Sequence, residues 1–185
     1  EVAIIMENEI KKDYYRYTGT DYQGKICRLI KKNSGFAYMF FWRKTKFAHN
    51  KISKYIYRCF LHHWAKRTGI EIPLSVELGA GVLFLHPYSI TMNSKTVAGK
   101  NLTVMKGATI GNTKGKNGGT PVIGDNVYIG LNSTVVGNIS IGNNVMIAAN
   151  TFVNFDVPDN SVVLGSPGIL HLNKNTVTDY LVNQI

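Results

Sequence analysis

The sequence predicts a mainly β protein, a parallel β-helix built from six-residue repeats and preceded by an α-helical segment. Aliphatic residues recur at every sixth position, and Asn or Asp recurs three positions after each of them. An α-helix has 3.6 residues per turn and cannot produce this period, whereas a solenoid with three short strands per coil can. Asn and Asp enter the left-handed region more readily than other non-glycine residues, so this column predicts the corners. The two columns are Ile123, Ile129, Val135, Ile141, Ile147, Val153 and Asn126, Asn132, Asn138, Asn144, Asn150, Asp156.

Residues 1–69 are predicted to form α-helices. Breaks at 18–20 and 33–35 bound one or two shorter helices within residues 8–33. A longer amphipathic helix is predicted after residue 50 and ends at Gly69, where glycine favours a helix C-terminus. Its apolar stripe consists of Ile52, Tyr55, Ile56, Cys59, Phe60 and His63, with Lys51, Lys54, Arg58 and Lys66 facing elsewhere.

The positive charge of the chain is concentrated in the same N-terminal segment. The net charge is +10, and residues 1–69 hold 15 of the 21 Lys and Arg but only 5 of the 11 Asp and Glu. This imbalance favours an anionic partner, such as the inner face of a membrane, as a peripheral contact. Nucleic acid is disfavoured, because no RNA-binding motif or basic recognition helix is present.

Targeting signals and cysteines set further expectations. No apolar run approaches the roughly 20 residues of a membrane span, and no signal peptide is evident. Cys27 and Cys59 do not form a disulfide framework, so a reduced, cytoplasmic setting is expected. No metal site is predicted.

The repeat reaches back to about residue 70 but is interrupted twice. One break, from Leu78 to Met92, contains His86; the other is the polar, Gly-rich stretch 111–121. Insertions in a solenoid become loops on one face and often carry function. We therefore expect a repeat domain over residues 70–168, followed by a tail over 169–185 with a short helix from Thr176 to Val182.

His86 is the candidate for acid–base chemistry. Histidine is the side chain whose unperturbed pKa lies nearest neutral pH, which makes it the commonest general base. The alternative is a partly buried histidine that is bonded to backbone groups and has no chemical role.

About 100 of the 185 residues resemble serine acetyltransferases, which are hexapeptide acyltransferases that use coenzyme A. Leu85-His86 stands where that family has Asp-His, 123–127 is its Ile-Gly-Asp-Asn-Val unit, and 165–168 resembles its Gly-Val-Pro-Ala. The resemblance implies a left-handed coil, although crossovers between parallel strands are ordinarily right-handed. It also implies a homotrimer with acetyl-CoA bound between subunits.

The resemblance also implies which residues form the site. His86 matches the family's catalytic base and Glu71 matches the acidic residue that orients it, at a position where the family usually has Asp. Backbone amides near the corner at Gly111 and Asn112 are candidates for stabilising the oxyanion. Coenzyme contacts are implied at Gly111, Asn112, Leu131, Ala149 and Gly165.

Departures from the family pattern concern the acceptor. Leu85 replaces an Asp that binds serine, and Thr120 stands where the family has the histidine of an Arg-His-Pro. With these charged anchors gone, an uncharged hydroxyl is expected, as in the capsule and exopolysaccharide O-acetyltransferases of this group that act on a sugar. Two alternatives stay open: a serine O-acetyltransferase, and a non-catalytic trimeric scaffold that binds an anionic membrane or nucleic acid.

Overall fold

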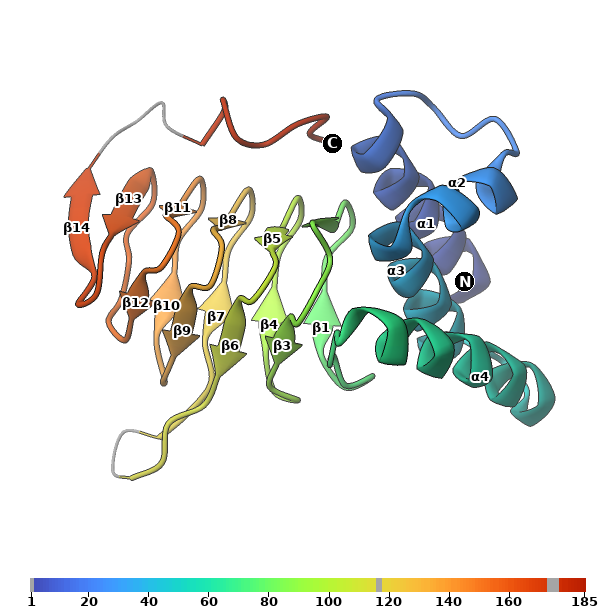
Figure 1. Ribbon diagram of the computed structural model, residues 1–185, viewed down its shortest axis with the longest axis horizontal. Coiled ribbons are helices and arrows are strands. Elements are labelled where there is room, and N and C mark those ends of the chain that lie inside the picture. Colours follow the sequence, from blue (N-terminus) through green and yellow to red (C-terminus); the bar gives the residue numbers. More distant parts are fainter. Residues whose placement is uncertain (1, 116–117, 173–176) are drawn as a thin grey trace.

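The computed structural model describes residues 2–115, 118–172 and 177–185, and it places helices at one end of a long β-helix (Figure 1). The predicted breaks before residue 35 separate the first three helices. The helices are α1 (Val2–Thr18), α2 (Ile26–Lys32), α3 (Ser34–Lys46) and α4 (Lys51–Thr68).

The β-helix has three faces, each a sheet of short strands that are parallel except for the last pair of the second sheet. Consecutive strands along the chain lie in different sheets up to β13, so three strands complete one coil. The first sheet holds β1 (Glu77–Leu78), β4 (Val97–Ala98), β7 (Val122–Ile123) and β10 (Ser140–Ile141). The second sheet holds β2 (Leu83–Leu85), β5 (Thr103–Met105), β8 (Tyr128–Ile129), β11 (Met146–Ile147), β13 (Ser161–Leu164) and β14 (Ile169–Leu172). The third sheet holds β3 (Thr91–Met92), β6 (Thr109–Gly111), β9 (Thr134–Val136) and β12 (Phe152–Val153).

The predicted aliphatic column forms the interior of this solenoid. Ile129 pairs in register with Val104 on one side and Ile147 on the other, and all three side chains are buried. Stacking one branched side chain per strand fills the narrow interior and removes apolar surface from water. The hexapeptide interpretation is therefore confirmed for the coils.

The Asn column forms two of the three corners as predicted. Asn126, Asn132, Asn144 and Asn150 have φ between 54° and 58°. Asn138 and Asp156 lie at the third corner and are not left-handed, because the preceding Gly137 takes φ 109° at the first of these turns. One corner also forms a side-chain ladder that joins successive coils. Asn101 donates to Asn126 at 2.8 Å, Asn126 donates to Asn144 at 2.9 Å, and Asn144 donates to Asn160 at 3.1 Å.

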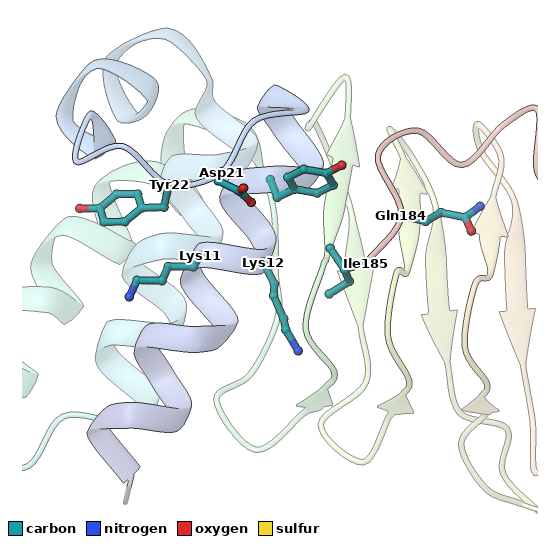
Figure 2. A pocket seen from close by; sticks show the side chains of 7 residues that line it. Lys11, Lys12, Asp21, Tyr22, Gln184 and Ile185 are labelled. Carbon is teal, nitrogen blue, oxygen red and sulfur yellow. The ribbon is translucent and has the colours of Figure 1, made fainter.

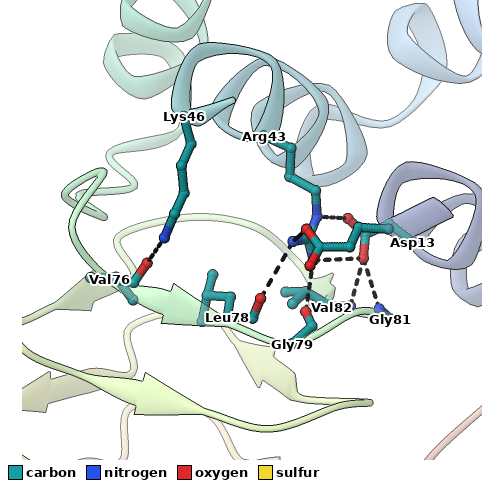
Figure 3. Close-up of polar contacts among 9 residues, drawn as sticks. Asp13, Arg43, Lys46, Val76, Leu78, Gly79, Gly81 and Val82 are labelled. Atoms are coloured by element: carbon teal, nitrogen blue, oxygen red, sulfur yellow. Dashed lines mark hydrogen bonds and ion pairs between the residues drawn. The ribbon is translucent and has the colours of Figure 1, made fainter. Parts of the chain in front are cut away.

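The N-terminal helices close the open end of the solenoid. Figure 3 shows that Asp13 of α1 accepts hydrogen bonds of 2.9 Å from the amides of both Gly81 and Val82. Arg43 of α3 donates to the carbonyl oxygen of Gly79 at 2.7 Å and pairs with Asp13 at 2.5 Å. Backbone groups of the first coil that lack a neighbouring strand are thus satisfied by side chains.

Helix α4 packs with the face opposite to its predicted stripe. Leu61, Trp64 and Ala65 lie against the hydrophobic core, whereas Ile52 and Tyr55 of the stripe are 76% and 71% exposed. The helix carries two apolar sectors, and the one with Trp64 meets α3 and the first coil. Figure 1 shows α4 extending away from the solenoid.

The tail does not form the predicted helix. Residues 177–180 form a turn, and Thr176 lies outside the described residues. β14 pairs antiparallel with β13, and residues 177–185 run along the second sheet towards the helices (Figure 1). Val177 and Leu181 are buried in a cluster with Tyr128. None of the helices described here is both long and apolar enough to span a membrane.

Candidate active site

His86 lies at the first interruption of the repeat, immediately after β2. Its backbone is in the left-handed region with φ 50°, and the amide of Tyr88 donates to its carbonyl oxygen at 2.8 Å. The side chain is exposed. The imidazole is therefore open to solvent and is not enclosed by backbone groups, as the structural alternative would require.

A hollow of about 370 Å³ contains His86 and Leu85. The N-terminal helices and the tail supply much of its wall, which the sequence did not predict. The only related signal in the sequence was the excess of basic residues over residues 1–69, which was interpreted as favouring an anionic partner. The additional lining residues are Arg16, Tyr17, Asn33, Leu83, Phe84, Pro87, Val182 and Asn183.

Two of these residues have unusual electrostatics. The amide of Phe84 donates to the Tyr17 hydroxyl at 2.8 Å, and burial raises the pKa of Tyr17. Burial lowers the pKa of Arg16 to about 10, which still leaves the guanidinium charged at neutral pH. Its Nη2 donates to Thr103 Oγ1 at 2.5 Å and its Nη1 to Asn101 Oδ1 at 3.4 Å.

Glu71 lies in a different hollow, of about 310 Å³, between α4 and the start of the β-helix. Its backbone bridges Thr91, and among the described residues it forms no hydrogen bond with His86. The predicted His86–Glu71 pair therefore stays a prediction. Burial, with the nearby charge of Glu71 as a smaller contribution, raises the pKa of Tyr38 to about 12.

Three of the predicted coenzyme residues form a ridge along one corner of the β-helix. Leu131, Ala149 and Gly165 follow β8, β11 and β13, which are neighbours in the second sheet. The amide of Asn150 donates to the carbonyl of Leu131 at 2.7 Å, and the amide of Phe152 donates to that of Gly165 at 3.0 Å. Successive coils therefore stack these positions one above another.

The other coenzyme candidates lie at a different corner. Gly111 ends β6, and Asn112 follows it and accepts a hydrogen bond of 3.1 Å from Asn93 Nδ2. Within one chain, the structure does not bring them to the ridge at Ala149.

The second interruption forms a loop that projects from the β-helix (Figure 1). A bridge between Thr113 and Gly119 closes it. Thr120 stands at its return and does not line the hollow of His86, so the two predicted acceptor contacts, Leu85 and Thr120, are apart in a single chain.

A larger hollow, of about 640 Å³, lies between α1, residues 21–22 and the end of the tail (Figure 2). None of the site residues predicted from the sequence lines it. Its walls hold Lys11, Lys12, Tyr15, Asp21, Tyr22, Gln184 and Ile185. Within the described ranges, no three or more His, Cys, Asp or Glu side chains gather as metal ligands would.

Comparison with known proteins shows that the β-helix is similar to bacterial transferases. Residues 120–154 match the family model for the bacterial transferase hexapeptide, six repeats. The serine acetyltransferase of Staphylococcus aureus is 41% identical over 103 residues, which are 55% of this chain and 48% of that enzyme. The chain spans about half or less of the length of the curated relatives it matches.

Solved structures extend the similarity to the helices. The crystal structure of Neisseria gonorrhoeae serine acetyltransferase superposes with a TM-score of 0.71 at 28% identity, covering 94% of this chain and 67% of that one. A serine acetyltransferase in complex with CoA has the same fold, with a TM-score of 0.71 at 20% identity, over 90% of this chain and 69% of that one. This likeness implies the left-handed coil expected above.

Proposed function

We propose that this protein is an acetyl-CoA-dependent O-acetyltransferase. The observation that carries the proposal is an exposed His86 beside a hollow, at an interruption of a hexapeptide β-helix. The similar proteins are named serine acetyltransferases, and one solved example holds CoA. A scaffold without activity would not need an accessible imidazole at this break.

The reaction follows from the chemistry of the imidazole. His86 takes the proton of the acceptor hydroxyl as the oxygen attacks the thioester carbonyl, and backbone amides near Gly111 would stabilise the resulting oxyanion. The tetrahedral intermediate then collapses, the carbon–sulfur bond breaks, and the imidazolium returns the proton to the coenzyme thiolate. The products are an O-acetyl ester and coenzyme A.

The names of the similar proteins point to serine as the acceptor, and we propose it as the first acceptor to test. The polysaccharide sugar expected from the sequence has no support among them. One observation keeps a neutral sugar hydroxyl as a second candidate: Leu85, which lines the His86 hollow, brings an apolar side chain where the family has a carboxylate.

A thiol-release assay tests this proposal. Purified protein is mixed with acetyl-CoA and either L-serine or a capsule-type oligosaccharide, and free coenzyme A is followed with a thiol reagent. Acceptor-dependent release identifies the enzyme, and the faster acceptor identifies the substrate class. Release with neither acceptor class would favour the scaffold alternative.

The assembly and the setting are part of the same proposal. We propose a homotrimer in which acetyl-CoA lies between the ridge at Ala149 of one chain and the Gly111 corner of the next. A cytoplasmic location is consistent with the exposed thiols of Cys27 and Cys59. Contact with an anionic membrane surface is proposed for α4, because its outward face combines apolar and basic residues.

A further inference from the structure

Arg16 is a buried cation without an ion pair. Its side chain belongs to a residue that is 1% exposed, and within the described part of the chain it takes part in no salt bridge. The closest acid along α1, Asp13, is engaged by Arg43 and by the amides of Gly81 and Val82. Among the described residues, the Arg16 guanidinium therefore has only neutral oxygens as hydrogen-bond partners.

The guanidinium is also incompletely hydrogen-bonded. Its Nη atoms donate to Thr103 and Asn101, but Nε is buried and has no hydrogen-bond partner among the residues that the structure describes. Removing a charge from water without a counter-charge is costly, and an unsatisfied donor adds to that cost. Stability alone does not explain a cation at this position.

The position of Arg16 suggests what would satisfy it. Arg16 lines the same hollow as His86, so a molecule that presents a hydroxyl to the imidazole lies close to Arg16. The planar fork of arginine matches the geometry of carboxylates and phosphates. Tyr17, beside it, is held neutral by its raised pKa and does not compete with such an anion.

We propose that Arg16 binds an oxyanion of the acceptor, so that the acceptor is a hydroxyl compound carrying a carboxylate or a phosphate. The inference rests on the proposed function and deepens it. A buried arginine from α1 then supplies a positive anchor that the residues at Gly119 and Thr120 lack. The carboxylate of serine is one group of this class.

The tail controls access to this subsite. Val182 and Asn183 line the hollow, and Asn183 Nδ2 donates to the carbonyl of Arg16 at 3.2 Å. Because the guanidinium is covered, an anion reaches it only when this part of the wall moves outward. We therefore expect binding of the anion to change the environment of residues 182–183.

The first test measures anion binding without turnover. Inorganic phosphate is titrated into the full chain by calorimetry at constant ionic strength, using wild type, Arg16→Gln and the matched control Arg28→Gln. Arg28 is exposed on α2, so its loss changes the net charge equally. We expect Arg16→Gln to weaken phosphate binding at least about 10-fold, as expected for loss of a charged hydrogen-bonding partner, and the control to bind as wild type does. Equal affinities in all three proteins, or no binding in wild type, would overturn the proposal.

The second test separates carboxylate from phosphate as the natural anion. With L-serine and L-serinamide as acceptors, Arg16→Gln should raise the KM for serine about 10-fold or more and leave the KM for serinamide and for acetyl-CoA nearly unchanged. Phosphate binding that depends on Arg16, without discrimination between serine and serinamide, would assign a phosphorylated acceptor. Wild type that binds phosphate through Arg16 but acetylates nothing would refute the enzyme and leave the anion subsite standing.

Two further variants distinguish anion binding by Arg16 from a purely structural role. Arg16→Lys retains the charge and should retain part of the phosphate affinity, whereas Arg16→Met removes the uncompensated charge. We expect Arg16→Met to melt at the same temperature as wild type or higher, because replacing a buried unpaired charge with an apolar side chain is often stabilising. A lower melting temperature combined with unchanged phosphate binding would show that Arg16 serves the fold alone.

Discussion

His86 illustrates how a single residue can be placed by the sequence and refined by the structure. The interruption of the repeat identified His86 as a candidate, and the structure adds that its backbone has φ 50°. Asn tolerates this region well, so His86→Asn removes the base and keeps the corner. We expect kcat to fall about 10²–10⁴-fold, as is usual for loss of a general base, with coenzyme affinity and melting temperature nearly unchanged. Steady-state kinetics and thermal unfolding provide the measurement.

The control is another exposed histidine. His171 lies on β14, outside the hollow of His86. His171→Asn should leave kcat at the wild-type value. Full activity of His86→Asn would refute its role as the base.

Glu71 provides a second test at this scale. If it orients His86 in the assembled protein, Glu71→Gln should lower kcat, but less than His86→Asn, because orientation is weakened and the base remains. The separate hollows of the two residues point to a small effect. A fall as large as that of His86→Asn would show that the pair acts as a unit.

Arg16 shows what no local pattern could reveal. Its partner Thr103 is 87 residues away along the chain, and the burial of its side chain depends on how α1 packs against β5. Ile129 was predictable because its period repeats. An arginine among tyrosines has no such signal.

The helices act on the β-helix as a cap on its first coil. Asp13 is 1% exposed and joins Arg43 to the backbone of residues 81 and 82. Asp13→Ala leaves a buried guanidinium without its main partner, which typically destabilises a protein by about 3–5 kcal/mol. We expect this loss in the free energy of unfolding measured with urea.

A surface pair serves as the comparison. Glu7 forms an ion pair with Lys11 at 2.8 Å on the exposed side of α1, and Glu7→Gln should leave the unfolding midpoint unchanged. A midpoint of Asp13→Ala that matches wild type would mean that the cap is held by apolar packing alone.

Helix α4 combines an exposed apolar stripe with five basic residues and no acidic residue in its sequence. Such a face suits an anionic lipid surface, where each Lys or Arg contributes about 1 kcal/mol. We predict that the protein sediments with vesicles containing phosphatidylserine at low salt and is released at high salt. Replacing Ile52 and Ile56 with serine should weaken this binding.

Val122→Ser is the matched control. Val122 is an exposed aliphatic residue on the β-helix, away from α4, and its replacement should leave vesicle binding unchanged. Binding that is absent, or that ignores both salt and the α4 variants, would leave the basic face as solvated surface. The outward direction of the stripe could not be predicted, because Trp64 and Leu61 form a competing apolar sector on the same helix.

At the scale of the whole molecule, the coils of the β-helix were predictable, whereas the packing of the helices and of the tail against them was not. A strict period fixes which side chains point inward, so the sequence defined the β-helix well. The return of the tail along the second sheet depends instead on contacts of Val177 and Leu181 with Tyr128, distant in sequence. The walls of the His86 hollow come from both α1 and this tail, which explains why the sequence predicted a candidate base there but did not predict the walls.

The arrangement of the predicted coenzyme residues leads to a prediction about assembly. Gly111 and Asn112 lie at one corner of the β-helix, whereas Leu131, Ala149 and Gly165 lie at another. A single coenzyme that touches both sets therefore has to lie between two chains, with the corner of one facing the ridge of the next. Closed symmetry with identical interfaces of this head-to-tail kind produces a ring.

We predict a ring of three chains. Light scattering at micromolar concentration should give a mass near three times the 20.6 kDa of the chain, and calorimetry should give one CoA per chain. Ala149→Trp places a bulky side chain on the ridge and should abolish CoA binding while preserving the trimer, because Ala149 is exposed outside the buried interior. A monomer that still binds one CoA with wild-type affinity would show that one chain holds the whole site, and it would remove the reason for assigning Gly111 and Ala149 to the same coenzyme.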